Sequence, residues 1–256
     1  TTSTMQQIAS SNLGMNPTTT MQVEQKLYEA GLITYMRTDS TSLSDQAKTD
    51  IVHYVKDVYG DKYVYTRNYK SKVMNSQEAH ECIRPVNISD DPRSVHIEDA
   101  YHKKLYDLIW KRSVACQMAD KEFTEQVLFI NAEENKKLVT IFNSQTVITT
   151  FPGYYILYEK DRGQLSKFDI NDTLDLKELL GEEKDTKPKP RYTEASLVKE
   201  LEKSGIGRPS TFSTIINTLL TRNYIEHGKK TNETEEKIIL KINKDKKEVI
   251  KQTKDK

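Results

Sequence analysis

Apolar residues recur at helical spacing through residues 1–118. Capping residues and glycines punctuate this pattern, as expected at helix ends. Residues 61–91 are polar and show little periodicity, and a loop of that length is often functional. The predicted helices are, in chain order, one from Ser3 to Gly14, one that ends at Gly31, and two over residues 44–59 and 99–117.

Short β-prone runs replace the helical pattern in the middle of the chain. They alternate with polar or Pro-Gly breaks, which is typical of a small antiparallel sheet. Residues 181–190 are rich in charge and proline and have the composition of a linker. The predicted strands cover residues 123–131, 137–142, 146–151 and 154–158.

The last part of the chain returns to helical spacing. One helix stops at Gly205-Ile206-Gly207 and a second starts at Pro209-Ser210-Thr211. Two short helices joined by such a turn are typical of a helix-turn-helix. Tyr224-Ile225 and residues 237–242 are predicted to form the strands of a wing. The lysine-rich stretch after Gly228 is predicted to be a frayed basic tail.

These patterns predict an α+β fold that is mainly helical, with a small antiparallel β region in the middle and a helix-turn-helix, winged-helix-like part at the end. We expect three parts. They are a helical domain over residues 1–118, a β-strand region over residues 119–190, and a helix-turn-helix domain with a basic end over residues 191–256.

Composition narrows the class of protein only in part. The 39 basic and 38 acidic residues give a net charge of +1, so any nucleic-acid contact must come from local patches. Cys82 and Cys116 form no C-x-x-C pair, which argues against structural zinc and favours a reducing, intracellular setting. No apolar run approaches the roughly 20 residues of a membrane span. The chain starts at a threonine inside a helical pattern, so we expect it to be part of a longer protein.

Tyr35 is a candidate nucleophile. It stands two residues before Arg37, so on an extended backbone the two side chains point the same way. A phenol has a pKa of about 10, and a nearby guanidinium favours the phenolate and can grip a phosphate with two hydrogen bonds. Tyrosine is an established covalent nucleophile. The chain has 14 tyrosines, so this spacing alone leaves a packing role open.

His80 is a second candidate and lies among carboxylates in the polar loop. An imidazole can donate a hydrogen bond to a phosphate oxygen or act as the general acid for a leaving hydroxyl. A surface histidine paired with Glu78 or Glu81 is the alternative interpretation.

Arg208, Ser210 and Thr211 surround Pro209 at the start of the last predicted helix. Proline just inside a helix start leaves exposed backbone N–H groups that suit a phosphate. The guanidinium and two hydroxyls at the same end would form a phosphate clamp, and an ordinary capped helix is the alternative.

Several segments, in this order and at this rough spacing, resemble the type IA DNA topoisomerases, and the bacterial topoisomerase I branch in particular. Several long matching segments in the same order are more specific evidence for a family than any single motif. The resemblance runs from Thr1 to about Ile225 and is weakest over the β region. The matching segments are TTSTMQQ (1–7), LYEAGLITYMRTDS (27–40), QEAHECIRP (77–85), YTEASLVKELE (192–202) and GIGRPST (205–211).

The resemblance implies a role for each candidate residue. Tyr35 matches the nucleophile that becomes joined to the 5′ phosphate of the cut strand, Arg37 matches the arginine that positions the scissile phosphate, and His80 matches the active-site histidine that contacts DNA beside it. DNA contacts are also implied at Thr38, Arg84, Arg208, Ser210 and Thr211.

The resemblance further implies an ATP-independent isomerase that cleaves one DNA strand, passes a strand and religates, relaxing negative supercoils. The expected partner is single-stranded or underwound DNA, without a membrane, and the expected state is a monomer. The family's Mg²⁺ is bound by a TOPRIM domain, expected upstream of Thr1. No metal ligand is therefore expected in this chain, which alone would not complete the reaction. It would form the central section of the family's toroid, in which helix-turn-helix, winged-helix-like domains flank a small antiparallel β arch.

Two other classes remain open. A non-catalytic winged-helix DNA-binding protein would explain residues 193–222 but leaves the Tyr35 and His80 segments unexplained. Tyrosine recombinases and type IB enzymes also use tyrosine, arginine and histidine. Their tyrosine follows the other residues near the C-terminus, whereas Tyr35 comes first.

Overall fold

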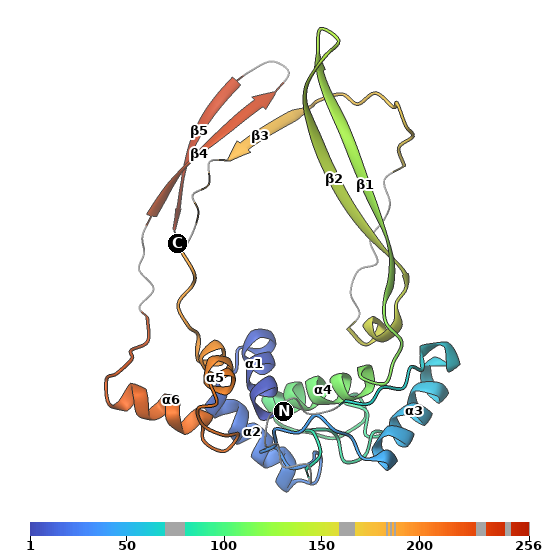
Figure 1. Cartoon of the computed structure of the whole chain (residues 1–256), viewed down its shortest axis with the longest axis vertical. Helices are drawn as coiled ribbons and strands as arrows, with labels where there is room; N and C mark the ends of the chain where they lie inside the picture. The colour runs from blue at the N-terminus through green and yellow to red at the C-terminus, as the bar shows by residue number, and fades with distance from the viewer. Residues whose placement is uncertain are drawn as a thin grey trace. The chain divides into compact units, whose positions relative to one another are not determined.

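The structure is a computed structural model (Figure 1) that describes residues 1–69, 80–158, 167–182, 184, 186, 188–228, 234–243 and 247–255. Gln77, Glu78 and Ala79 of the His80 motif lie outside the described residues. The chain divides into two units. The first comprises Thr1–Ser166 and Tyr192–Thr218, and the second comprises Lys167–Arg191 and Leu219–Lys256.

The first unit begins with the helices α1 (Thr2–Leu13), α2 (Pro17–Glu29), α3 (Asp45–Tyr59) and α4 (Ala100–Ala115). All four were predicted from apolar periodicity and are confirmed. The first helix starts at Thr2 and not at the predicted Ser3: the Thr1 side chain accepts the N–H of Thr4 and caps the helix, and Ser3 is buried within it. The cap residues of the four helices are Thr1, Asn16, Ser44 and Asp99.

The apolar stripes of these helices form one core, and α4 attaches the preceding loop to it. The Tyr106 hydroxyl donates to the Asp90 carbonyl at 2.8 Å, and the Trp110 indole donates to the Ile88 carbonyl at 2.9 Å. The second half of the polar loop, around residues 88–90, is therefore held against α4. Side chains at the centre of the core are Leu27, Val55, Leu105, Ile109 and Met118.

A long hairpin follows α4, formed by β1 (Glu122–Glu134) and β2 (Lys137–Phe151) in antiparallel register. Asn135 and Lys136 join the strands and both have positive φ, as a two-residue type I′ turn requires. The predicted antiparallel strands are confirmed here, but two of them are one strand, because β2 continues through the polar residues 143–145.

The predicted strand over residues 154–158 is wrong. This stretch belongs to a 3₁₀ helix, η2 (Gly153–Tyr158). Gly153 has a φ of 49°, and a Cβ there would collide with the carbonyls of Ala119 and Asp120. The Tyr154 N–H also donates to the Ala119 carbonyl at 2.8 Å, which turns the chain out of the sheet.

The helices α5 (Glu194–Lys203) and α6 (Phe212–Thr221) follow. α5 packs against α1, where the Ser3 hydroxyl donates to Glu202 at 2.7 Å. The last helix begins at Phe212, directly after the predicted start at Pro209-Ser210-Thr211, so Pro209 lies before the helix and not just inside it. The N–H groups of Thr211 and Phe212 both donate to the Arg208 carbonyl, which closes a turn around the proline before α6 begins.

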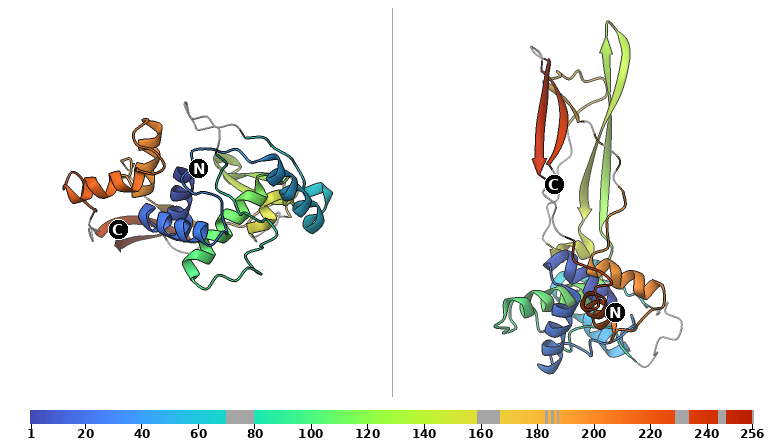
Figure 2. Two further views of the ribbon diagram at one scale, coloured as in Figure 1. Left: turned by 90° about the horizontal axis from the view of Figure 1, so that it is seen from below. Right: turned by 90° about the vertical axis from the view of Figure 1, so that its left-hand side faces the viewer.

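The second unit contains an antiparallel sheet in the order β3 (Glu178–Glu182), β4 (Thr234–Asn243) and β5 (Lys247–Asp255) (Figure 2). The predicted strand at 237–242 is confirmed within β4. Tyr224-Ile225 form a turn and not a strand. The predicted tail is largely β5, and Gly181, assigned to a linker, lies in β3, because strand pairing supplies partners that local composition does not reveal.

Helices and small antiparallel sheets together confirm the mixed α+β class at this level. The domain boundaries at residues 118/119 and 190/191 stay predictions. None of the helices in the described part of the chain has the length and apolarity that crossing a membrane requires.

Candidate active site

The extended segment after α2 is hydrogen-bonded to residues 82–86, in the polar loop. The Thr34 N–H donates to the Arg84 carbonyl at 2.9 Å. The Thr34 hydroxyl donates to the Cys82 carbonyl at 2.8 Å and accepts the Arg84 N–H at 3.0 Å. Because both its donor and its acceptor capacity are used, this threonine fixes the loop beside the segment that carries Tyr35.

Burial alternates along the segment that carries Tyr35. The Tyr35 side chain is 43% exposed and Arg37 is exposed, whereas Met36 and Thr38 are 1% and 2% exposed. The alternation places Tyr35 and Arg37 on the same, solvent-facing side of the segment. The phenol is therefore accessible from the solvent.

The first turn of α1 binds the same segment. The Thr2 N–H donates to the Thr38 carbonyl at 2.9 Å. The Thr2 hydroxyl donates to the Met36 carbonyl at 2.6 Å and accepts the Thr38 N–H at 2.9 Å. The first N–H groups of a helix have no partner within the helix, and here one of them holds the backbone beside Arg37.

Tyr28, in the last turn of α2, packs edge-on against Tyr35, with ring centroids 5.4 Å apart and planes at 68°. Such aromatic pairs contribute about 0.5–1.5 kcal/mol beyond the area they bury, so the contact favours one orientation of the Tyr35 ring. Sequence reasoning did not single out Tyr28 or Thr2. Both lie in the segments that carry the family resemblance, and this was the only signal available for them.

His80 opens the second described stretch of the chain and is exposed. Two residues later, the Cys82 N–H donates to the Ser42 carbonyl at 2.8 Å. The loop is thereby bonded to the Tyr35 segment on both sides of the tyrosine, through Thr34 and through Ser42. The structure thus brings the start of the His80 loop and the Tyr35 segment together, as neighbouring pieces of backbone.

The Cys82 thiol does not compete with Tyr35 as a nucleophile. It forms no disulfide, and burial raises the pKa of Cys82 to about 11. A thiol attacks as the thiolate, so at neutral pH this side chain is inert.

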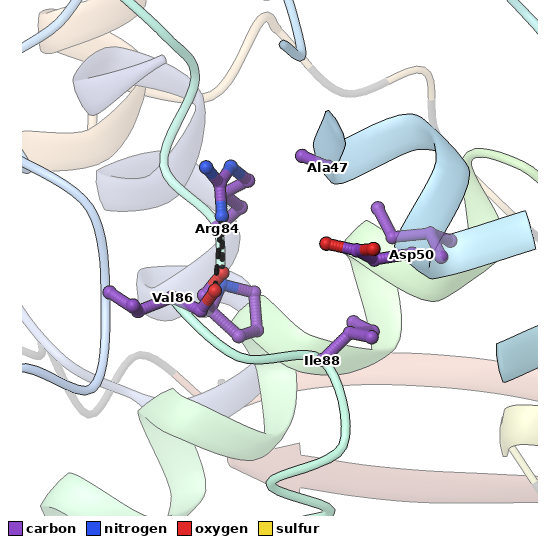
Figure 3. A pocket seen from close by; sticks show the side chains of 7 residues that line it. Ala47, Asp50, Arg84, Val86 and Ile88 are labelled. Carbon is purple, nitrogen blue, oxygen red and sulfur yellow. Dashed lines mark hydrogen bonds between the residues drawn. The ribbon is translucent and has the colours of Figure 1, made fainter. Parts of the chain in front are cut away.

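Arg84 is engaged within its own loop (Figure 3). Its Nε donates to Glu81 at 2.6 Å and its Nη1 donates to the Pro85 carbonyl at 2.9 Å, with 16% of the side chain exposed. Burial opposes ionisation of Glu81, but hydrogen bonds from Arg84 and Ser44 outweigh it and hold the pKa of Glu81 below its ordinary value.

A small depression lies beside Arg84, between α3 and the loop (Figure 3). Its volume is about 230 Å³ including its open side, which is below the roughly 300 Å³ at which small-molecule sites begin. We therefore regard it as a packing feature. It is lined by Ala47, Asp50, Ile51, Arg84, Pro85, Val86 and Ile88.

The residues predicted to clamp a phosphate, Arg208, Ser210 and Thr211, are exposed at the turn before α6. The Thr211 hydroxyl accepts the Arg208 N–H at 2.8 Å. Gly207 permits this turn, because its φ is 81° and a Cβ would lie 2.7 Å from Ile215 Cδ1. Arg208, Ser210 and Thr211 follow α5 in the chain. The first turn of α1 is hydrogen-bonded both to α5 and to the segment that carries Tyr35, so it links the two.

The histidine, cysteine, aspartate and glutamate side chains of the described ranges include no group of three or more arranged to hold a metal ion. The chemistry described below uses the chain's own groups.

Comparisons with known proteins agree with the fold. A family model described as DNA topoisomerase matches residues 1–252. DNA topoisomerase 1 of Rickettsia felis is 44% identical over 249 residues, which cover 90% of this chain and 32% of the relative. The mimivirus protein "DNA topoisomerase 1 type prokaryotic" (Acanthamoeba polyphaga mimivirus) is 39% identical over 242 residues, with 88% and 28% covered.

A solved structure, full-length topoisomerase I of Thermotoga maritima, matches with a TM-score of 0.71 and 36% identity over 89% of this chain and 38% of that chain. The chain belongs to the type IA DNA topoisomerase family, with bacterial topoisomerase I among its relatives. The predicted resemblance is thereby confirmed. The chain spans about a third of the length of the curated relatives it matches.

Proposed function

We propose that this chain carries the nucleophile of an ATP-independent DNA topoisomerase. The Tyr35 phenolate oxygen attacks a backbone phosphorus of one DNA strand, and the bond from that phosphorus to the 3′ oxygen breaks. The enzyme becomes joined to the 5′ phosphate, and the leaving 3′ oxygen takes up a proton. After a strand passes, the 3′ hydroxyl attacks the phosphotyrosine and restores the DNA, which relaxes negative supercoils.

The observation that carries this proposal is the exposure of Tyr35 and Arg37 on one side of a segment whose backbone is fixed at residues 34, 36 and 38. Arg37 would favour the phenolate and grip the scissile phosphate with two hydrogen bonds. Preorganised geometry of this kind lowers a reaction barrier because orientation is fixed before the substrate binds.

His80 would contact the DNA beside the scissile phosphate, as a donor to a phosphate oxygen or as the acid for the leaving 3′ hydroxyl. Its exposure and its place at the start of the anchored loop support this role.

The DNA contacts proposed for the remaining residues differ in kind. Arg208, Ser210 and Thr211 are exposed and suit direct contact with phosphates of single-stranded or underwound DNA. Thr38 is buried and Arg84 is bonded within its loop, which favours indirect roles: these two would support the backbone that carries Tyr35 and His80.

For the whole protein we propose an intracellular monomer, with the Mg²⁺ of the family held by a TOPRIM domain outside this chain. The ion would supply positive charge near the scissile phosphate when bound. The helix-turn-helix interpretation of α5 and α6 is likewise part of this proposal, and their short connection through Gly205-Ile206-Gly207 supports it.

The test is covalent trapping on a single-stranded oligonucleotide by the native gene product that carries this sequence. With a 3′-end label, the label should migrate with the denatured protein, because the protein holds the 5′ end of the downstream piece. Tyr35→Phe should abolish the adduct and leave binding of uncut DNA unchanged. Tyr28→Phe, a neighbouring tyrosine, is the matched control and should retain the adduct.

Two outcomes would refute the proposal. An adduct that persists in Tyr35→Phe would exclude this tyrosine. An adduct that carries only a 5′-end label would mean attachment to the 3′ end of the cut strand, which is the chemistry of tyrosine recombinases and type IB enzymes.

A further inference from the structure

The TTSTMQQ segment at residues 1–7 carries part of the family resemblance, but the chemistry above gives it no role. Its second residue, Thr2, has a fully buried side chain and is the first residue of α1. Its hydroxyl and its N–H together make four hydrogen bonds to the backbone around Arg37, 34 and 36 residues away along the chain.

We propose that Thr2 is a positioning residue for the nucleophile, which rests on the function proposed above. Its hydroxyl donates to the Met36 carbonyl at 2.6 Å and accepts the Thr38 N–H at 2.9 Å, and its own N–H donates to the Thr38 carbonyl at 2.9 Å. One residue therefore fixes the backbone on both sides of Arg37.

The geometry explains why a threonine suits this place. A hydroxyl can donate and accept at once, whereas a buried hydroxyl or N–H group without a partner is unfavourable. Any shift of the Met36–Thr38 backbone would leave the Thr2 hydroxyl and the Thr38 N–H buried without partners. The segment therefore has one strongly favoured position against α1.

The consequence for Tyr35 follows from its two neighbours. The Thr34 backbone and hydroxyl are bonded to the polar loop, and the Met36 carbonyl is bonded to Thr2. The backbone of Tyr35 is thus held at both ends, and the freedom that remains is mainly that of its side-chain torsions. A reacting oxygen held in this way needs less reorganisation to reach the phosphorus.

The test compares Thr2→Val, which removes the hydroxyl but keeps the shape, with Thr2→Ser, which keeps the hydroxyl. Thr20→Val is the matched control, because Thr20 is also fully buried but its hydroxyl donates to Asn16 in the same turn of its own helix, at 2.9 Å. All variants are made in the native gene product, whose overall fold is checked by thermal unfolding.

Two quantities are measured for each variant. One is the single-turnover rate of adduct formation on single-stranded DNA, set beside the dissociation constant for the same DNA in a Tyr35→Phe background, where no cleavage follows binding. The other is hydrogen–deuterium exchange in a peptic peptide that spans residues 36–40, which reports on the Thr38 amide without any chemistry.

We expect Thr2→Val to slow adduct formation by about 10- to 100-fold at an unchanged dissociation constant, and to speed exchange at Thr38. Thr2→Ser should restore the rate to within about threefold of the wild type, and Thr20→Val should leave the rate and the exchange at Thr38 unchanged. Equal rates in Thr2→Val and wild type, or equal losses in Thr2→Val and Thr20→Val, would overturn the positioning role.

The two proposals can fail separately. If the wild type forms no adduct, the proposed function is wrong, and the exchange measurement still decides whether Thr2 fixes this backbone. If the wild type forms the adduct through Tyr35 but the Thr38 amide exchanges as slowly in Thr2→Val as in the wild type, the proposed function stands and the positioning role of Thr2 is refuted.

Discussion

Glu24 of α2 gives a prediction about stability that can be worked out from the structure. Its side chain is fully buried, and neither carboxylate oxygen has a hydrogen-bond partner among the described residues. Burial raises the pKa of Glu24 from 4.5 to about 8. At pH 7 the folded chain therefore holds Glu24 mainly as the neutral acid.

The sign of the pH dependence follows from this raised pKa. In the unfolded chain the carboxyl ionises near pH 4.5, while in the folded chain it stays protonated up to about pH 8. The stability that goes with the raised pKa is fully present below pH 4.5 and is lost as the pH rises to about 8. At about 1.4 kcal/mol per pH unit, the loss between pH 5 and pH 9 is about 4 kcal/mol.

The perturbation that isolates this effect is Glu24→Gln, which keeps the size of the side chain and removes its titration. Urea unfolding is followed by the fluorescence of Trp110, the single tryptophan, which lies in the core beside α4's other buried residues. The unfolding free energy of the variant minus that of the wild type should rise by about 4 kcal/mol from pH 5 to pH 9. Other titrating groups cancel in this difference.

A difference that stays constant within about 1 kcal/mol over this range would refute the reasoning. It would mean that Glu24 ionises near its ordinary pKa in the folded chain, either in contact with water or beside a cation. A difference that falls with pH would reverse the sign and would require a charged partner for the carboxylate.

The remaining predictions concern DNA contact and backbone strain. Arg208→Ala should weaken binding of single-stranded DNA and lower the slope of log affinity against log salt by about 0.7. Lys103→Ala, on an exposed part of α4, is the control, and an equal change in both variants would count against a clamp at α6. Gly153→Ala should lower the unfolding free energy by about 2 kcal/mol or more, because its φ is 49° and the new Cβ would meet the Ala119 and Asp120 carbonyls. Gly228→Ala, which meets nothing within 4 Å, should change it little, and equal urea midpoints for the two variants would refute this interpretation.

The helices could be predicted from the sequence because their signals are local. Apolar residues three and four apart give the buried stripe, and residues such as Ser44 and Gly60 mark the ends of α3.

The β region was harder because strand limits depend on pairing partners. Residues 143–145 are polar and resemble a break between two strands. β2 nevertheless runs through them, because their backbone pairs with β1 whatever the polarity of their side chains. Tyr154 to Tyr158 have the composition of a strand, but the close approach of Gly153 to two carbonyls turns the chain into η2.

The candidate site was predictable in part. The spacing of Tyr35 and Arg37 on an extended segment indicated a shared direction, and their common exposure agrees with this. Thr2 could not be found in that way, because its contacts join residues 34 to 36 positions apart. Such long-range hydrogen bonds leave no local pattern, and the structure was needed to show them.

The most direct test of the central claim is mass spectrometry of the adduct after nuclease and trypsin digestion. Cleavage after Lys26 and Arg37 releases one peptide, LYEAGLITYMR, that holds both Tyr28 and Tyr35. We predict that fragmentation of this peptide places a nucleotide, joined through its 5′ phosphate, on Tyr35. A nucleotide on Tyr28, on any other side chain, or joined through its 3′ phosphate would contradict the mechanism.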